Sequence, residues 1–231
     1  MPTSLIAKPP RTQEQALSKA YSILCYAHDT VESLLKTLRA VRSQRGARGS
    51  LTDEEQDLLR AMLVFASAGL DSMAKQVIHD TLPQLTDRHD KAKAALEVYA
   101  TRRLGRVEIE DQMSVDTKFL ARVLVSPSPR SGIVEELVRE LTAGSLQSPD
   151  EVLRVVHHLG MDPKELPATP QRLRDVFVAR NRIIHEMDID FSHVSRNRRT
   201  HTQAAIVAMV NELLAMGHAI MRHVAGALAV P

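Results

Sequence analysis

Aromatic residues and cysteine are scarce in this chain of 231 residues. It has no tryptophan, three tyrosines, four phenylalanines and one cysteine, Cys25. So few rings argue against a single-strand-binding platform of the β-sheet type, because such platforms stack bases on exposed aromatic side chains. A single cysteine excludes an internal disulfide, as is usual in a reducing compartment. We therefore expect a cytoplasmic protein that builds its core without disulfides.

An excess of charge of one sign and long apolar runs are also missing. The chain has 30 lysines and arginines against 28 aspartates and glutamates, a net charge of +2. No overall field draws it to nucleic acid or to a membrane, so any basic surface must be local. The most apolar stretches, residues 61–70 and 204–210, are far shorter than the roughly 20 residues that cross a bilayer. No secretion signal is visible. We expect a soluble protein with no membrane partner.

Several motifs that mark common enzyme classes do not occur. The chain has no GxxxxGKS or GxxxxGKT loop, no GxGxxG and no GxSxG, so nucleotide hydrolysis and serine-hydrolase chemistry have no support. The histidines lack the repeated spacing of zinc ligands, and the adjacent pair His157 and His158 would point in two directions on a helix. We therefore expect neither a bound metal nor a cofactor.

Helix-forming residues are abundant instead. Leucine, alanine and arginine are the most abundant residues of the chain, and they are among the residues that lose least on entering a helix, as are its glutamates and glutamines. Apolar spacing and turn residues predict helices over residues 12–42, 52–81, 87–103, 114–125, 133–142, 149–159, 170–187 and 202–228. We expect an all-α bundle of long antiparallel helices, forming one domain with a small-helix insertion at about 105–165. A division into two domains at the insertion is the alternative.

The predicted helix over 170–187 carries a cation on its apolar face. On a helical wheel, Arg180 falls in the middle of the stripe formed by Leu173, Val176, Phe177, Ile183, Ile184 and Met187. A guanidinium cannot lose its proton, so a buried one needs a carboxylate, a phosphate or a set of oriented acceptors. One interpretation is a structural ion pair with Asp71 or Asp29 on a neighbouring helix. The other is a site for an anionic ligand.

Asn181 and His185 lie at the border of the same stripe. Arg180 and His185 diverge on a single helix, but two copies packed about a twofold axis could bring both pairs into one cleft. These residue types suit RNA cleavage by the 2′-hydroxyl, in which histidine transfers protons and arginine holds the phosphate. Such a reaction requires no metal. The sequence therefore predicts catalysis by Arg180, Asn181 and His185 in a homodimer.

The same pattern occurs twice, since Arg196 to His201 repeats the Arg-Asn-x3-His spacing without an apolar face. We interpret this second stretch as an exposed loop before the last helix. Its cations, Arg196, Arg198 and Arg199, would form a solvated basic patch, with contact to RNA phosphates as the alternative. Arg182 faces away from the stripe and is another candidate for contact with the RNA backbone.

The motif Arg180-Asn181 followed by His185, near the end of a late helix with one more long helix after it, resembles the signature of ribonuclease-type members of the HEPN superfamily. The long segment over 51–82, with Leu70-Asp71 in its middle, is similar to the second helix of the RiboL-PSP-associated HEPN group. The preceding helix, with His28-Asp29, also suits that group. The resemblance covers most of residues 15–80 and 170–230.

This resemblance implies a dimeric helical bundle with metal-independent RNA endonuclease activity that leaves cyclic-phosphate ends. It also implies a role in toxin–antitoxin systems or anti-phage defence, with an antitoxin or regulatory protein as a partner. Arg180 and His185 would be catalytic, and we add Asp29 or Asp71 as supporting residues that orient the arginine. Some members have lost cleavage, so a non-catalytic module that binds a partner, a nucleotide or RNA is the alternative function.

Overall fold

The computed structural model describes residues 4–46, 49–104, 108–109, 112–113 and 117–229. They form α1 (Ser18–Gln44), α2 (Asp53–Arg88), α3 (Asp90–Leu104), α4 (Thr117–Val125), α5 (Pro129–Ala143), α6 (Pro149–His158), α7 (Pro170–Glu186) and α8 (Gln203–Ala229). Two 3-10 turns, η1 (Gln15–Leu17) and η2 (Pro163–Glu165), and one two-residue antiparallel pair, β1 (Glu108–Ile109) with β2 (Gln112–Met113), complete the elements. The predicted all-α class is confirmed.

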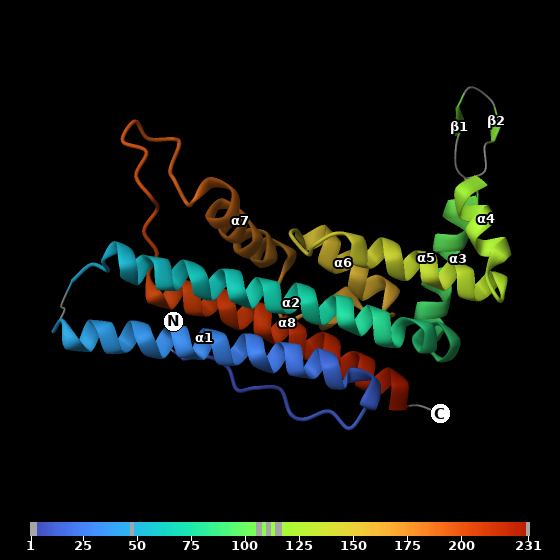
Figure 1. Cartoon of the computed structure of the whole chain (residues 1–231), viewed down its shortest axis with the longest axis horizontal. Helices are drawn as coiled ribbons and strands as arrows, with labels where there is room; N and C mark the ends of the chain where they lie inside the picture. The colour runs from blue at the N-terminus through green and yellow to red at the C-terminus, as the bar shows by residue number, and fades with distance from the viewer. Residues whose placement is uncertain (1–3, 47–48, 105–107, 110–111, 114–116, 230–231) are drawn as a thin grey trace.

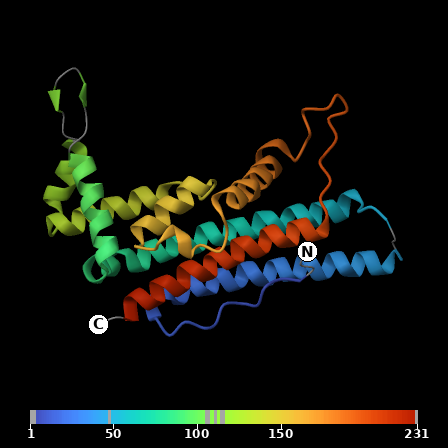
Figure 2. The same ribbon diagram turned by 180° about the vertical axis from the view of Figure 1, so that it is seen from behind.

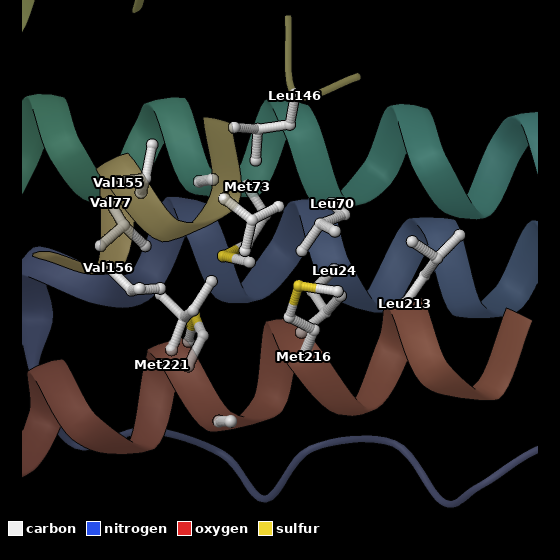
Figure 3. Packing of buried hydrophobic residues seen from close by; sticks show 14 of the residues in the cluster. Leu24, Leu70, Met73, Val77, Leu146, Val155, Val156, Leu213, Met216 and Met221 are labelled. Carbon is white, nitrogen blue, oxygen red and sulfur yellow. The ribbon is translucent and has the colours of Figure 1, made fainter. Parts of the chain in front are cut away.

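Three long helices, α1, α2 and α8, lie side by side, and α1 runs opposite to the other two (Figures 1 and 2). Their facing sides are apolar: Leu24, Leu70, Met73, Leu213 and Met216 are each at most 1% exposed (Figure 3). Gly69 allows α1 and α2 to approach closely, because a Cβ atom at this position would lie 2.2 Å from the Cβ of Ala27. The core of the molecule therefore lies along these three helices.

Helix α2 begins where the sequence predicts and ends later. Thr52 accepts a hydrogen bond from the backbone of Glu55, whose side chain accepts one from the backbone of Thr52, which is a capping box. The helix continues through Pro83 to Arg88, whereas we expected it to end near residue 81. Leu82 and Leu85, on either side of the proline turn, are fully buried. Their burial outweighs the backbone hydrogen bond that Pro83 cannot donate.

The insertion packs along the second half of α2. Helices α3 to α6 contact one another, α3, α5 and α6 also contact α2 directly, and α4 with the short β pair projects outward (Figure 1). Helix α5 begins four residues earlier than predicted, because Ser128 caps it and Pro129 occupies its first turn. Buried residues such as Phe119, Leu137 and Val155 belong to the same continuous cluster as the bundle core.

Helix α8 is the one helix in the described part of the chain that is long and apolar enough to cross a bilayer. Its most apolar window has a mean hydropathy of 1.6, and 56% of that window is buried inside the bundle. This apolar window is longer than the uninterrupted apolar run over residues 204–210 that the sequence shows. Single polar residues such as Asn211 end that run but hardly change the mean hydropathy of the window. A buried core helix can be as long and as apolar as this, so length and composition alone do not make α8 a membrane span.

Candidate functional site

Helix α7 rests on α2 beside α6, outside the three-helix bundle (Figure 1). Thr169 caps it by accepting a hydrogen bond from the backbone of Arg172. The predicted apolar stripe is buried along most of its length, at Leu173, Val176, Phe177 and Ile183. Its last turn differs from the prediction: Ile184 is 39% exposed and Met187 is 62% exposed. The end of α7 therefore presents apolar side chains to solvent in a single chain.

Arg180 is half-buried, as its position on this stripe requires. Its Nη1 donates to Asn181 Oδ1 at 2.8 Å, and its Nε is buried without a hydrogen-bond partner. Among the residues that the structure describes, no carboxylate lies within ion-pair distance of this guanidinium. Its charge is therefore not neutralised within the described chain.

The two aspartates expected to support Arg180 contact other groups. Asp71 accepts a hydrogen bond from the backbone of Leu146 at 2.7 Å and pairs with Lys75 at 2.9 Å. Asp29 pairs with Lys8, and it lies close to His28 and Glu32 in a group whose ligand atoms are within 4.8 Å of one another. The structural ion pair considered for Arg180 is not formed with either residue.

Asn181 connects α7 to the loop between α5 and α6. Its Oδ1 accepts from Arg180, and its Nδ2 donates to the backbone oxygen of Gln147 at 3.3 Å. The neighbouring residue of this loop, Leu146, is the one held by Asp71. The amide of Asn181 thus places the guanidinium of Arg180 relative to α2 and α6.

His185 is exposed one turn after Asn181. The wheel separates it from Arg180, so one copy of α7 does not direct both side chains at one atom. The structure contains a single chain, and the expected cleft between two protomers stays a prediction.

The second Arg-Asn-x3-His stretch forms part of the loop between α7 and α8, as predicted, but much of it is anchored. Arg198 pairs with Asp57 at 2.7 Å and donates to the backbone oxygen of Met187. Arg199 donates to the backbone oxygen of Ile189 at 2.7 Å and pairs with Asp190. The hydrogen bonds from Arg198 and Arg60 lower the pKa of Asp57 below its ordinary value.

The interpretation of a solvated basic patch therefore needs correction, because Arg198 and Arg199 hold the loop in place. Arg196 is exposed, with a left-handed backbone at φ 48°, and Arg182 is exposed on α7. Contact of any of these four arginines with RNA stays a prediction. Arg182 and Arg196 have the freer side chains for that role.

A buried ionic cluster just beyond α7 escaped the sequence analysis. Asp188, 1% exposed, accepts from Nε of Arg60 at 2.9 Å and lies 2.7 Å from Nε2 of His201. Arg60, 4% exposed, also donates to the backbone oxygen of Arg199 at 2.6 Å. Met187 and Asp188 adopt left-handed backbones that reverse the chain towards α2. This cluster clamps the end of α7 and the following loop onto α2.

A signal for this cluster was present in the sequence. Arg60 lies next to Leu59 and three residues before Leu63 on the apolar face of α2. Like Arg180, a cation on such a face needs an anionic or acceptor partner. Its partner, 128 residues further along the chain, could not be identified from spacing.

Comparisons with protein-family models, with curated proteins and with solved structures found no match to this chain.

Proposed function

We propose that this protein is a metal-independent RNA endonuclease of the HEPN type, with an active site shared by the α7 helices of a homodimer. One observation carries the proposal: Arg180 is a half-buried cation without a carboxylate partner in the described chain, held by Asn181 on the helix that also exposes His185. Its Nε is buried without a hydrogen-bond partner, and an anion that accepts from the guanidinium would satisfy it. The phosphate of an RNA backbone is such an anion.

The chemistry assigned to these residues is an internal transesterification. The 2′-oxygen forms a bond to phosphorus while the bond from phosphorus to the 5′-oxygen breaks, leaving a cyclic phosphate and a 5′-hydroxyl. One His185 imidazole accepts the proton of the 2′-hydroxyl, and a second, from the other protomer, protonates the leaving oxygen. Arg180 donates to the phosphate oxygens as their charge grows. Each proton transfer contributes on the order of 10²–10⁴-fold to the rate.

The exposed end of α7 favours self-association. Ile184, Met187 and Phe191 are 39%, 62% and 59% exposed and occur within eight residues of His185. A twofold interface repeats each group across the axis, so burying these side chains would bring the two copies of His185 towards each other. In the proposed homodimer, one interface would both bury these apolar side chains and bring the two His185 residues into a shared site.

A ribonuclease in the cytoplasm requires restraint. The HEPN resemblance supplies the biological part of the proposal, a toxin or defence effector controlled by an antitoxin or another regulatory protein. Arg182 and Arg196, both exposed near the α7 end, are the proposed contacts to RNA on either side of the cleaved bond.

The proposal is tested by cleavage of RNA in EDTA. We expect the purified protein to cut in EDTA and to leave cyclic-phosphate ends, and His185→Ala to lose at least about 10²-fold in rate while keeping its fold and dimer. His79→Ala is the matched control, because His79 is an exposed histidine on α2, 72% exposed at its side chain, outside the proposed site. If His185→Ala cuts as fast as the parent, the proposed catalytic role is wrong.

A second candidate function is a non-catalytic interaction module. It is favoured by the exposed apolar end of α7, which could bind a different protein, and by the separation of Arg180 from His185 within one chain. In that case the parent protein would not cut RNA, and substitution of Met187 by a charged residue would abolish partner binding. Sedimentation of the purified chain separates the two: the nuclease proposal requires a dimer that Met187→Glu dissociates.

A further inference from the structure

A hollow of about 650 Å³ lies beside the C-terminal half of α8. Helix α8 finishes at the opposite end of the bundle from the end of α7 (Figure 1). Its walls are His89 at the junction of α2 and α3, Met161 and Glu165 after α6, and the C-terminal half of α8. The volume is in the range of small-molecule sites, roughly 300–1,000 Å³. None of the residues proposed for RNA cleavage lines it, so the hollow is separate from that site.

The hollow exists because small residues surround a cation on one face of α8. Ala219 and Gly226 are three residues before and four residues after Arg222, so all three share a face of the helix. A Cβ atom built on Gly226 would meet nothing within 4 Å. Arg222 is exposed, and no carboxylate of the described chain lies within ion-pair distance of it. The α8 wall thus offers a guanidinium beside open space.

His223 lines the same hollow, one residue after Arg222. Its Nε2 lies 3.2 Å from the backbone oxygen of Leu159, and its Nδ1 lies 3.4 Å from Oε2 of Glu165. The His223 ring is therefore held by contacts at both of its nitrogens. Glu165, the one carboxylate among the lining residues, is engaged by this imidazole.

His89 completes the basic wall. Its ring meets that of His223 edge to face, with centroids 5.6 Å apart, and Gly160 packs against its buried, unpartnered Nδ1. His89 lines the hollow, and we place its Nε2 on the open side because Nδ1 is the buried nitrogen. Burial, followed by the charges of His223 and Lys91, lowers the pKa of His89, against smaller opposing effects of Asp90 and Glu165. A neutral ring places its proton on Nε2, because a buried Nδ1–H would lack an acceptor.

We propose that this hollow binds a small molecule through a phosphate group. The guanidinium of Arg222 supplies a fork of two N–H donors and His89 supplies a third, which together match the three free oxygens of a phosphate monoester. Glu165, the one carboxylate in the lining, lies against His223, so the guanidinium of Arg222 remains for the anion. The small side chains beside Arg222 leave room for the rest of the ligand.

Binding is measured on the full chain with inorganic phosphate as the probe, by NMR titration of the histidine Cε1–H signals. Phosphate should shift the His89 signal and raise the pKa of His89, because a bound anion stabilises the protonated ring. Arg222→Gln should weaken phosphate binding about tenfold, which corresponds to about 1.4 kcal/mol. Arg174→Gln, which removes an exposed arginine from α7, should leave binding unchanged.

Four outcomes would overturn the proposal. The first is no phosphate-dependent shift of His89, and the second is equal phosphate affinity in the parent and Arg222→Gln. The third is that acetate binds as tightly as phosphate, which would mean a carboxylate site. A short RNA that displaces phosphate from the hollow would make it part of an RNA path and would also contradict a small-molecule ligand. No cleavage is measured, so failure here leaves the nuclease proposal unaffected.

Discussion

Replacing Arg60 or Arg180 by methionine provides a direct comparison of two arginines on apolar helix faces. Arg60→Met removes the buried partner of Asp188, which is 1% exposed and whose Oδ1 has no hydrogen bond of its own. It also removes the donor to the backbone oxygen of Arg199. Breaking one side of a buried ion pair costs about 3–5 kcal/mol. His201 continues to contact Asp188, so we expect the lower part of this range, about 3 kcal/mol.

Arg180→Met should cost far less. This guanidinium makes a hydrogen bond to the neutral amide of Asn181, and no carboxylate of the described chain is left unpaired when it is removed. A single hydrogen bond of this kind contributes about 0.5–1.5 kcal/mol, and the methionine retains the apolar contacts of the arginine stem. We expect a loss of about 1 kcal/mol or a slight gain.

Urea unfolding followed by far-UV circular dichroism measures both values, since the chain has no tryptophan to report by fluorescence. A double-mutant cycle of Arg60→Met with Asp188→Asn assigns the cost to the pair, because asparagine tolerates the left-handed backbone of this position. Equal losses for Arg60→Met and Arg180→Met would refute the view that Arg180 is kept for a ligand. A double-mutant cycle that shows no coupling energy between Arg60 and Asp188 would refute the ion pair assigned to the buried cluster.

Two further predictions concern stability. Gly69→Ala should lower the free energy of unfolding by about 1–3 kcal/mol, because the added methyl group forces α1 and α2 apart. Gly144→Ala is the control, because a Cβ atom at Gly144 would meet nothing within 4 Å. A thermal melt of Gly69→Ala that matches the parent would contradict the close approach of the two helices. Burial, helped by the charges of His157, Arg154 and Arg102, lowers the pKa of His158 to about 4 from an ordinary 6.5. The contribution of neutral His158 to the free energy of unfolding is fully present above pH 6.5 and is lost as the pH falls towards 4, by on the order of 1–3 kcal/mol. His158→Gln should therefore flatten the dependence of stability on pH in this range. An unchanged slope in the variant would contradict the prediction.

Many helix boundaries follow from local sequence signals. The start of α2 follows from the capping box of Thr52 and Glu55, and α7 begins where Thr169 and Pro170 predict. These signals act between residues a few positions apart, so they can be recognised without knowledge of the fold. The boundary errors at Pro83 and at Pro129 arose where proline was treated as a helix end although it lies within a helix that packing supports or in a first turn. The first long helix also begins at Ser18, six residues later than predicted.

The candidate site could be predicted in part. The wheel of residues 170–187 identified a cation on an apolar face, and Arg180 is half-buried there. The same wheel could not identify what covers each turn, so the exposure of Ile184 and Met187 was missed. It also proposed carboxylate partners, Asp29 and Asp71, that contact Lys8, Lys75 and the backbone of Leu146 instead.

Periodicity and capping, which depend on neighbours within one or two turns, were enough to specify an all-α chain and most helix boundaries. Pairing between distant residues depends on how helices pack, and no spacing rule encodes it. Arg60 meets Asp188 across 128 positions, and His89, just after α2, meets His223 near the end of α8. The anchored loop after α7 and the basic hollow beside α8 therefore became visible only when the helices were assembled, because both consist of contacts between segments that the chain keeps far apart.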